Sequence, residues 1–330
     1  MGMGDPGSVN KARVFALHLL PEVVARRLDD SFAMVWNRGD GDLSVATLVE
    51  RAGEFDGFLT TVTDRVPAEV FSAPQRRLRI VANYGVGVDL IDLEAARRGK
   101  VVVTNTPGVL TDCTADLTIA LILMVLRRAG EGERLVREGR WTGWRPTQLL
   151  GRRAFGATLG VVGMGRIGQA VATRAFRGFG MKIRYHGRSR LPLELEERLG
   201  ATWRSLDELL SESDIVTLHC PLTTETAGII DARRIGLMRG DAIFINTARG
   251  ALVDDAALAD ALRAGRLGGA GLDVYRNEPE VPAGLRELEN VVLLPHLGSA
   301  TRESRVAMGM MAFENLRRFF AGEPPPNRVV

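Results

Sequence analysis

Short runs of apolar, β-branched residues alternate with segments of helical period along nearly the whole chain. This alternation is typical of α/β proteins, in which helices join parallel strands and cover the sheet. We expect strands at residues 14–18, 33–36, 58–61, 80–84, 101–105, 158–162, 182–185, 215–219, 242–247, 271–274 and 291–295. A single sheet of common size contains fewer strands than this. The pattern therefore predicts two doubly wound parallel-sheet domains.

Residues 111–137 do not follow this alternation. Their apolar stretch, which ends in charged residues, predicts a single helix of about 40 Å at 1.5 Å per residue, long enough to bridge two domains. Thr111 and Asp112 are candidate caps for its first turn. We expect the Gly- and Trp-rich stretch at 138–151 to form a loop docked on another surface.

The order of the segments predicts that one domain is inserted into the other. The last helical segment, residues 301–320, follows the strand at 291–295 and can return to the first domain. We therefore expect a split first domain, residues 1–110 and 298–330, with residues 111–297 inserted as the second domain.

The composition argues against several classes of protein. The longest mostly apolar stretch, residues 117–126 with Thr118 within it, is about half of what a bilayer-spanning helix needs. The 43 basic residues are scattered among 40 acidic ones, so the formal charge of +3 indicates a mixed, solvated surface rather than a nucleic-acid site. The first ten residues lack the apolar core of a secretory signal, and their glycines and proline predict a frayed tail.

Cysteine usage bears on the compartment. Cys113 and Cys220 are the only two cysteines, and their spacing is not that of metal ligands. This indicates a reducing environment, so we expect a cytoplasmic protein without a metal site.

A glycine-rich fingerprint follows the strand expected at 158–162 and opens a helix. It reads, in order, Gly163, Met164, Gly165, Arg166, Ile167 and Gly168, a G-x-G-x-x-G motif. With a further strand at the right distance, it predicts a dinucleotide-binding Rossmann unit. The glycines allow a tight turn, the approach of a pyrophosphate, and close packing of helix on strand, and the free N–H groups of the helix face the phosphates.

The choice of dinucleotide depends on the residues after the next strand. An NAD site has an acidic residue about 20 positions after the motif, for the ribose 2′-hydroxyl. Residues 181–193 contain no acid, and offer Arg188, Ser189 and Arg190, which suit a 2′-phosphate. We therefore predict NADP, used as NADPH, with tolerance of NAD as the alternative.

Polar residues also follow three strands of the inserted domain, at the strand ends where ligands bind in open α/β folds. They are Arg249, Asp273 with Glu278, and His296. The surrounding motifs NTARG, LDVYRNEP and PHLGSAT, with VVGMGRIG and LHCPLTTET, resemble the D-isomer-specific 2-hydroxyacid dehydrogenase family, over about residues 81–301. The motifs NYGVG, TPGVLTDCTADL and GRWTGWRPTQLLG further resemble its glyoxylate/hydroxypyruvate reductase branch.

The resemblance implies a fold with two Rossmann/flavodoxin-like domains, in which the nucleotide domain is inserted into a split substrate domain. It assigns His296 as the acid/base, Glu278 as its partner and Arg249 as the substrate anchor. Physical chemistry agrees, because reduction of a 2-keto acid needs a proton for the carbonyl oxygen, and imidazole titrates near neutral pH. A carboxylate beside the ring favours its charged form, and a guanidinium fork suits a substrate carboxylate.

Further positions are implied for the ligands. Backbone N–H groups of Gly85, Val86 and Gly87 would complete the substrate carboxylate site, and Asp273 would meet the nicotinamide carboxamide. Other family positions that line the cofactor correspond to Thr111, Cys220, Pro221, Thr226, Thr247 and Gly298.

The resemblance also bears on assembly. It implies a homodimer, in which either Trp141 or Trp144 reaches the substrate site of a partner subunit. We expect the other three histidines, His18, His186 and His219, to be structural.

These observations predict an NADP-dependent reductase that converts glyoxylate or hydroxypyruvate to glycolate or D-glycerate. One alternative is an NAD-linked dehydrogenase of D-3-phosphoglycerate or another D-2-hydroxy acid, against which stand the missing ribose-binding acid and an expected absence of a regulatory tail after Val330. Another is a non-catalytic dinucleotide sensor of the corepressor type. A sensor needs no proton donor, so the joint presence of Arg249, Glu278 and His296 argues against it.

Overall fold

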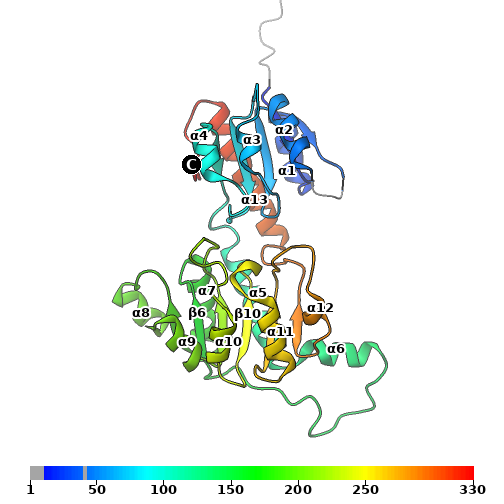
Figure 1. Cartoon of the computed structure of the whole chain (residues 1–330), viewed down its shortest axis with the longest axis vertical. Helices are drawn as coiled ribbons and strands as arrows, with labels where there is room; N and C mark the ends of the chain where they lie inside the picture. Colours follow the sequence, from blue (N-terminus) through cyan, green and yellow to red (C-terminus); the bar gives the residue numbers. More distant parts are fainter. Residues whose placement is uncertain (1–10, 40–42) are drawn as a thin grey trace, which may run out of the picture. The chain divides into compact units, whose positions relative to one another are not determined.

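Two parallel β-sheets organise the computed structural model, which describes residues 11–39 and 43–330 (Figure 1). One sheet has five strands in the order β2-β1-β3-β4-β5, and the other has seven in the order β12-β11-β10-β9-β6-β7-β8. The predicted α/β class with two parallel sheets is confirmed. The tail expected in the first ten residues lies outside the described part of the chain.

The chain divides into two compact units, which we call unit 1 and unit 2. Unit 1 comprises the residues up to Val109 together with Thr301–Val330, and unit 2 comprises Leu110–Ala300. These divisions fall at positions 109 and 301, where the sequence placed them at 110 and 298.

Unit 1 holds the five-stranded sheet. Its strands are β1 (Arg13–Ala16), β2 (Ala33–Trp36), β3 (Gly57–Thr61), β4 (Ile80–Tyr84) and β5 (Val102–Thr104). Its helices are α1 (Glu22–Ser31), α2 (Val45–Glu54), α3 (Ala68–Phe71), α4 (Leu93–Arg98) and α13 (Arg302–Phe320). Every residue of β4, an inner strand of this sheet, is buried, and α13 packs against β4 and α1.

Unit 2 holds the seven-stranded sheet. Its strands are β6 (Thr158–Val162), β7 (Lys182–His186), β8 (Ala201–Trp203), β9 (Ile215–Leu218), β10 (Ile243–Asn246), β11 (Gly269–Leu272) and β12 (Val291–Leu293). Its helices are α5 (Thr111–Leu126), α6 (Ala129–Arg137), α7 (Arg166–Phe179), α8 (Leu193–Leu199), α9 (Leu206–Glu212), α10 (Ala232–Leu237), α11 (Asp255–Arg263) and α12 (Ala283–Arg286), with a 3₁₀ turn, η1 (Gly250–Leu252). The strand order reverses between β6 and β9, and ligands bind at such a switch point in open α/β sheets.

The prediction of a single helix over residues 111–137 is wrong. α5 ends at Leu126, and α6 begins after Arg128, whose φ of 52° is left-handed and breaks the helical path. The two helices also differ in environment. α5 packs on α7, β10 and β11, whereas α6 has no buried residue. The apolar run at 117–126 is therefore part of the core of unit 2.

The caps expected for that helix are also wrong. The N-cap position of α5 is Leu110, and no side chain caps it. Asp112 instead accepts a hydrogen bond of 2.9 Å from Arg174 of α7, and so links the two helices.

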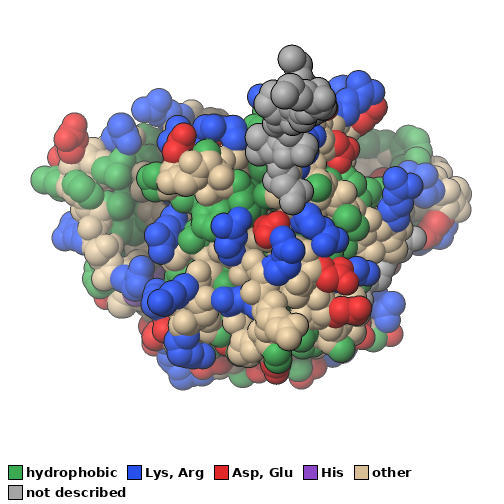
Figure 2. Space-filling model, turned by 90° about the horizontal axis from the view of Figure 1, so that it is seen from above, with side chains coloured by type: hydrophobic (Ala, Val, Ile, Leu, Met, Phe, Trp, Pro, Cys, Tyr) green, Lys and Arg blue, Asp and Glu red, His purple; other side chains and the backbone are tan. Residues whose placement is uncertain are grey.

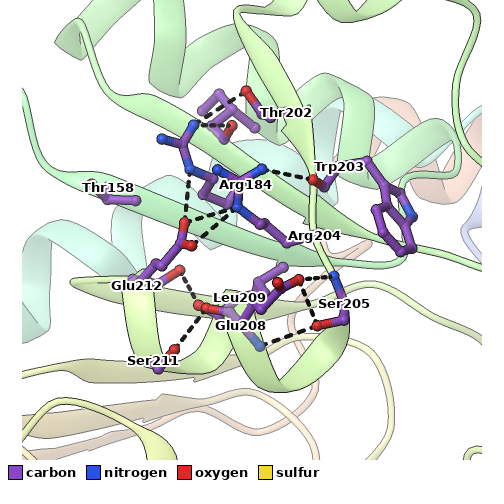
Figure 3. A network of polar contacts seen from close by, with 12 residues as sticks. Thr158, Arg184, Thr202, Trp203, Arg204, Ser205, Glu208, Leu209, Ser211 and Glu212 are labelled. Carbon is purple, nitrogen blue, oxygen red and sulfur yellow. Dashed lines mark hydrogen bonds and ion pairs between the residues drawn. The ribbon is translucent and has the colours of Figure 1, made fainter.

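A polar network holds the β7 and β8 edge of the large sheet (Figure 3). Glu212 of α9 accepts hydrogen bonds from Arg184 of β7, at 3.2 Å, and from Arg204 after β8, at 3.0 Å. Ser205 and Glu208 form a reciprocal capping box at the start of α9. β8 itself was not expected, because a three-residue strand leaves almost no periodic signal in the sequence.

The surface agrees with the expected mixture of charges. On the face in Figure 2, basic side chains are scattered among acidic and apolar ones rather than gathered in one patch. None of the helices in the described ranges is both long and apolar enough to span a membrane.

Candidate active site

The two residues assigned to proton transfer are in contact. His296 follows β12, and its Nδ1 lies 2.7 Å from Oε2 of Glu278, in the loop after β11. Their side chains are 27% and 20% exposed, so the pair is sheltered but reachable. Within the described residues Nε2 of His296 has no hydrogen-bond partner, which leaves it available for proton transfer to a bound molecule.

Glu278 is held as an anion. Its Oε1 accepts the backbone N–H of Tyr275 at 3.1 Å. Burial acts to raise the pKa of Glu278, but the hydrogen bond and charge of His296, the Tyr275 N–H and the charge of Arg249 outweigh it, so this pKa lies below its usual range. An ionised carboxylate at this point favours the charged form of the imidazole.

Asp273 fixes the backbone that carries His296. It lies at the end of β11 with no exposed surface, and its two carboxylate oxygens accept the N–H groups of Leu297, at 2.6 Å, and Gly298, at 2.7 Å. Its carbonyl accepts the His296 N–H at 2.9 Å. His296 has a left-handed φ of 55°, which costs an L-residue roughly 1–2 kcal/mol. These three hydrogen bonds hold it in that conformation.

Burial raises the pKa of Asp273, although the Leu297 and Gly298 N–H groups and the charge of His296 oppose the shift. Each oxygen of Asp273 can accept a second hydrogen bond, and a nicotinamide carboxamide can donate one. This contact with the cofactor stays a prediction.

Arg249 follows β10, the neighbour of β11 in the sheet. Its carbonyl accepts Asn246 Nδ2 at 2.8 Å, and its own Nη1 donates to the Ala248 carbonyl at 2.7 Å. A Cβ at Gly250 would lie 2.0 Å from the backbone of Tyr275, so only glycine lets the loops after β10 and β11 approach this closely. The adjacent strands β10, β11 and β12 thus bring Arg249, Glu278 and His296 to one edge of the sheet.

The glycine fingerprint has the geometry of a dinucleotide site. A Cβ at Gly163 would lie 2.4 Å from the backbone nitrogen of Cys220, and one at Gly168 would lie 2.2 Å from the Gly163 carbonyl oxygen. A Cβ at Gly165, by contrast, would meet nothing within 4 Å, and Gly165 is the N-cap of α7. The turn is therefore closely packed at Gly163 and Gly168 and open at Gly165. The free N–H groups of Arg166 and Ile167 follow this open position, which suits a pyrophosphate.

The segment expected to face the ribose lies beside this turn. The N–H of Gly163 donates to the His186 carbonyl at 2.8 Å, and residues 187–190 follow directly. Arg188 and Ser189 are exposed, and no other described side chain forms a hydrogen bond with theirs. Arg190 differs, because its Nε and Nη2 donate to the two oxygens of Glu196, each at 2.9 Å.

The remaining predicted cofactor positions lie around the same end of the large sheet. Cys220 and Pro221 follow β9, and the Thr226 hydroxyl donates to the Pro221 carbonyl at 2.7 Å. Burial raises the pKa of the Cys220 thiol to about 11, so it stays neutral. Thr247 follows β10, and its hydroxyl lies 3.0 Å from that of Thr118.

Two further predicted positions belong to α5 and to the loop after β12. Thr111 is the first residue of α5. Three residues later, the Thr114 hydroxyl donates to the Gly298 carbonyl at 3.0 Å, and so ties α5 to that loop.

Gly85, Val86 and Gly87 follow β4, in unit 1. The Gly85 N–H donates to the Asn83 carbonyl at 3.0 Å. The N–H groups of Val86 and Gly87 have no backbone partner among the described residues. A Cβ at Gly85 would lie 2.0 Å from Val62 Cγ1, so glycine is required there. Their contribution to a substrate site with residues of unit 2 stays a prediction.

The other histidines have structural partners. His18 contacts Asp64 at 2.9 Å, His186 Nδ1 donates to the Arg204 carbonyl at 3.1 Å, and His219 lies 3.0 Å from the Thr217 hydroxyl. Burial lowers the pKa of His219 to about 3, so it is neutral at physiological pH.

Sequence reasoning missed several supporting residues. Tyr275 donates its hydroxyl to the Leu294 carbonyl at 2.9 Å and so joins the loops that carry Glu278 and His296. Tyr185 and Glu196 support the segment before α8. None of the three gave a distinctive signal, because a tyrosine within a strand pattern and an acid within a charged helix are ordinary.

Comparison with known proteins agrees with this geometry. Residues 119–298 match the family model described as "D-isomer specific 2-hydroxyacid dehydrogenase, NAD binding domain". The chain is 46% identical over 324 residues to a glyoxylate reductase of Thermococcus litoralis, covering 97% of each chain. It is 51% identical over 289 residues to a glyoxylate reductase of Aeropyrum pernix, covering 86% of this chain and 85% of the relative.

Solved structures give the same result. The TT0316 protein of Thermus thermophilus has a TM-score of 0.89 at 48% identity, covering 96% of this chain and 100% of that one. An NADPH-dependent glyoxylate/hydroxypyruvate reductase of Sinorhizobium meliloti, solved with NADP and malonate, has a TM-score of 0.85 at 35% identity and covers 97% of both chains.

A glycine turn at the switch point of a Rossmann sheet, with a histidine and carboxylate pair after two other strands of that sheet, is typical of an NAD(P)-dependent oxidoreductase. With the matches above, the chain belongs to the D-isomer-specific 2-hydroxyacid dehydrogenase family, in the branch of the glyoxylate reductases. The resemblance found in the sequence motifs is confirmed.

Proposed function

We propose that the protein reduces glyoxylate or hydroxypyruvate with NADPH, giving glycolate or D-glycerate. The observation that carries this proposal is the 2.7 Å contact between His296 and Glu278, at the strand edge that also holds Arg249. It is supported by the 46% identity to a glyoxylate reductase over nearly the whole chain.

The residues of the site suit this reaction. Bound NADPH would supply a hydride to the carbonyl carbon of the substrate. Arg249 would bind the substrate carboxylate and polarise the keto oxygen. Protonated His296 would donate its Nε2 proton to that oxygen as the hydride arrives, and the ring, left neutral, would take up a proton from solvent. Glu278 would orient the ring and stabilise its charged form.

The preference for NADPH is argued from charge. Residues 181–193 carry no acid that could bind a ribose 2′-hydroxyl, and Arg188 and Ser189 are exposed beside the glycine turn. A relative at 35% identity is NADPH-dependent. NAD is the alternative cofactor, because the glycine turn would contact mainly the pyrophosphate, which both dinucleotides carry.

A second copy of the chain is the proposed partner. α6 has no buried residue, and Trp141 and Trp144 after it are 53% and 79% exposed. Large apolar side chains that are exposed and close together in the sequence suit an interface, which we propose is that of a homodimer. The two free cysteines, Cys113 and Cys220, support a reducing compartment such as the cytoplasm.

A substrate panel tests the function. NADPH or NADH is mixed with glyoxylate, hydroxypyruvate, pyruvate and 3-phosphohydroxypyruvate, and loss of absorbance by the reduced nicotinamide is followed. We expect the highest kcat/KM for NADPH with glyoxylate or hydroxypyruvate. Fastest turnover of 3-phosphohydroxypyruvate with NADH would favour the alternative dehydrogenase. Tight binding of cofactor without turnover of any substrate would favour the sensor.

A further inference from the structure

One buried carboxylate anchors the segment between β7 and α8. Glu196, in α8, has a side chain only 5% exposed. Its Oε1 accepts the Tyr185 hydroxyl at 2.6 Å and Arg190 Nε at 2.9 Å, and its Oε2 accepts Arg190 Nη2 at 2.9 Å. The Tyr185 hydroxyl in turn accepts the Leu191 N–H at 2.7 Å.

These contacts fix one end of the segment and leave the other end open. Arg190 is fixed by a two-pronged ion pair, and Leu191 is fixed through its backbone. Tyr185 is fully buried in β7, so its hydroxyl cannot move far. Arg188 and Ser189 lie next along the chain toward the glycine turn, with exposed side chains.

We propose that Glu196 is a positioning residue for the 2′-phosphate of NADP, because through Arg190 and Tyr185 it fixes the backbone that presents Arg188 and Ser189. This inference rests on the proposed preference for NADPH. It gives Arg190 a supporting role in the segment, since the Nε and Nη2 edge of its guanidinium is taken by Glu196.

The reason is preorganisation. An exposed arginine and a short loop lose conformational entropy when they bind a phosphate, and a loop held in place beforehand loses less. NADH lacks the 2′-phosphate, so its binding does not depend on this order. The hydrogen bonds of Arg190 and Tyr185 lower the pKa of Glu196 despite its burial, which keeps it ionised for both partners.

Charge alone predicts the opposite effect. Replacing Glu196 by a neutral residue removes a negative charge near the phosphate and frees Arg190 to approach it. If that effect dominated, the variant would prefer NADPH more strongly than the parent does. We expect positioning to dominate, because Arg190 already neutralises Glu196, whereas a neutral side chain loses the two-pronged ion pair that fixes Arg190 and the segment around it.

The test compares Glu196→Gln and Tyr185→Phe with the parent protein. The first keeps the shape of the side chain, and the second keeps the buried ring and removes one hydroxyl. The ratio of kcat/KM for NADPH to that for NADH is measured with glyoxylate. Binding of 2′,5′-ADP and 5′-AMP is measured by calorimetry, which reports the 2′-phosphate contact without turnover.

We expect the NADPH to NADH ratio to fall about tenfold in Glu196→Gln, and by less in Tyr185→Phe, as for loss of a hydrogen bond to a charged group. Binding of 2′,5′-ADP should weaken by the same factor while 5′-AMP binding is kept. Glu314→Gln is the matched control, because Glu314 likewise accepts hydrogen bonds from arginine side chains, those of Arg317 and Arg318, but in α13 of unit 1. Its ratio should equal that of the parent.

An unchanged or raised ratio in Glu196→Gln, with a parent that prefers NADPH, would overturn the positioning role and leave the proposed function standing. A parent that binds 2′,5′-ADP no better than 5′-AMP would overturn the NADPH preference itself, and this inference with it.

Discussion

Two carboxylates support His296 in different ways. Glu278 contacts the ring and supplies negative charge, whereas Asp273 contacts only the backbone and holds its left-handed conformation. Asp273 therefore fixes the backbone that carries the ring, whereas Glu278 acts on the ring itself, and substitutions can separate the two effects.

Glu278→Gln should lower kcat/KM for glyoxylate by roughly 10²-fold, within the usual range for proton-transfer groups. The neutral amide no longer places a negative charge beside the ring that donates the proton, so the chemical step should slow. Affinity for NADPH should stay the same. Glu280→Gln is the control, since Glu280 is exposed two residues further on. A kcat/KM equal to the parent's would contradict the role of Glu278.

The same substitution has a consequence for stability. The pKa of Glu278 in the folded protein lies below its usual value of 4.5. Its charge therefore stabilises the folded state above about pH 4.5, and this contribution is lost as the pH falls through the lowered pKa. The parent's advantage in Tm over Glu278→Gln should accordingly shrink in acid, which thermal melts at several pH values can measure.

At the scale of elements, most of the architecture could be predicted because strands with buried faces carry a strong pattern. The ranges for β2, β4 and β6 agree with the expected ones residue for residue. The break between α5 and α6 could not be predicted, because it depends on the backbone of Arg128 and on which helix face finds a core. Local propensity does not report either.

The candidate site divides in the same way. Gly163, His296 and Glu278 were found because their motifs combine residue type with position after a strand. Glu196 was not, because its neighbours in the sequence are acids of a charged helix, and only the fold shows that this one faces inward toward Tyr185.

The contact between β6 and α7 can be tested with two glycines of one helix. In Gly168→Ala the new methyl group would lie 2.2 Å from the Gly163 carbonyl oxygen, so α7 must shift away from the turn. We expect affinity for NADPH to fall at least tenfold, and the free energy of unfolding to fall by about 1–3 kcal/mol. Gly178→Ala is the control, since its Cβ meets nothing within 4 Å. Equal affinities in the two variants would contradict the role of Gly168.

The surface of the protein bears on its assembly. The exposed apolar side chains of unit 2 include Val136, Trp141, Trp144 and Leu150, on or after α6. Figure 1 shows this stretch of unit 2 running out beyond the helices that cover the sheet. Burying such residues against a second copy would remove them from water, which stabilises a dimer by roughly 25 cal/mol per Å² of apolar surface.

Sedimentation should accordingly show a particle of twice the chain mass of 35.9 kDa. The double substitution Trp144→Ser with Leu150→Ser should shift it toward the single chain, because two large apolar side chains of the proposed interface are lost. Leu193→Ser, at an equally exposed leucine of α8, should leave it unchanged. A parent that sediments as one chain would contradict the homodimer.

The left-handed backbone of His296 also determines which substitution can keep cofactor and substrate bound together without reaction. Asparagine is among the residues that best tolerate this conformation, and its amide has no proton to give at neutral pH. His296→Asn should thus preserve the loop that Asp273 holds, whereas alanine would strain it. Such a protein could keep NADPH and its keto acid unreacted for crystallography, as a snapshot of the ternary complex just before the chemical step.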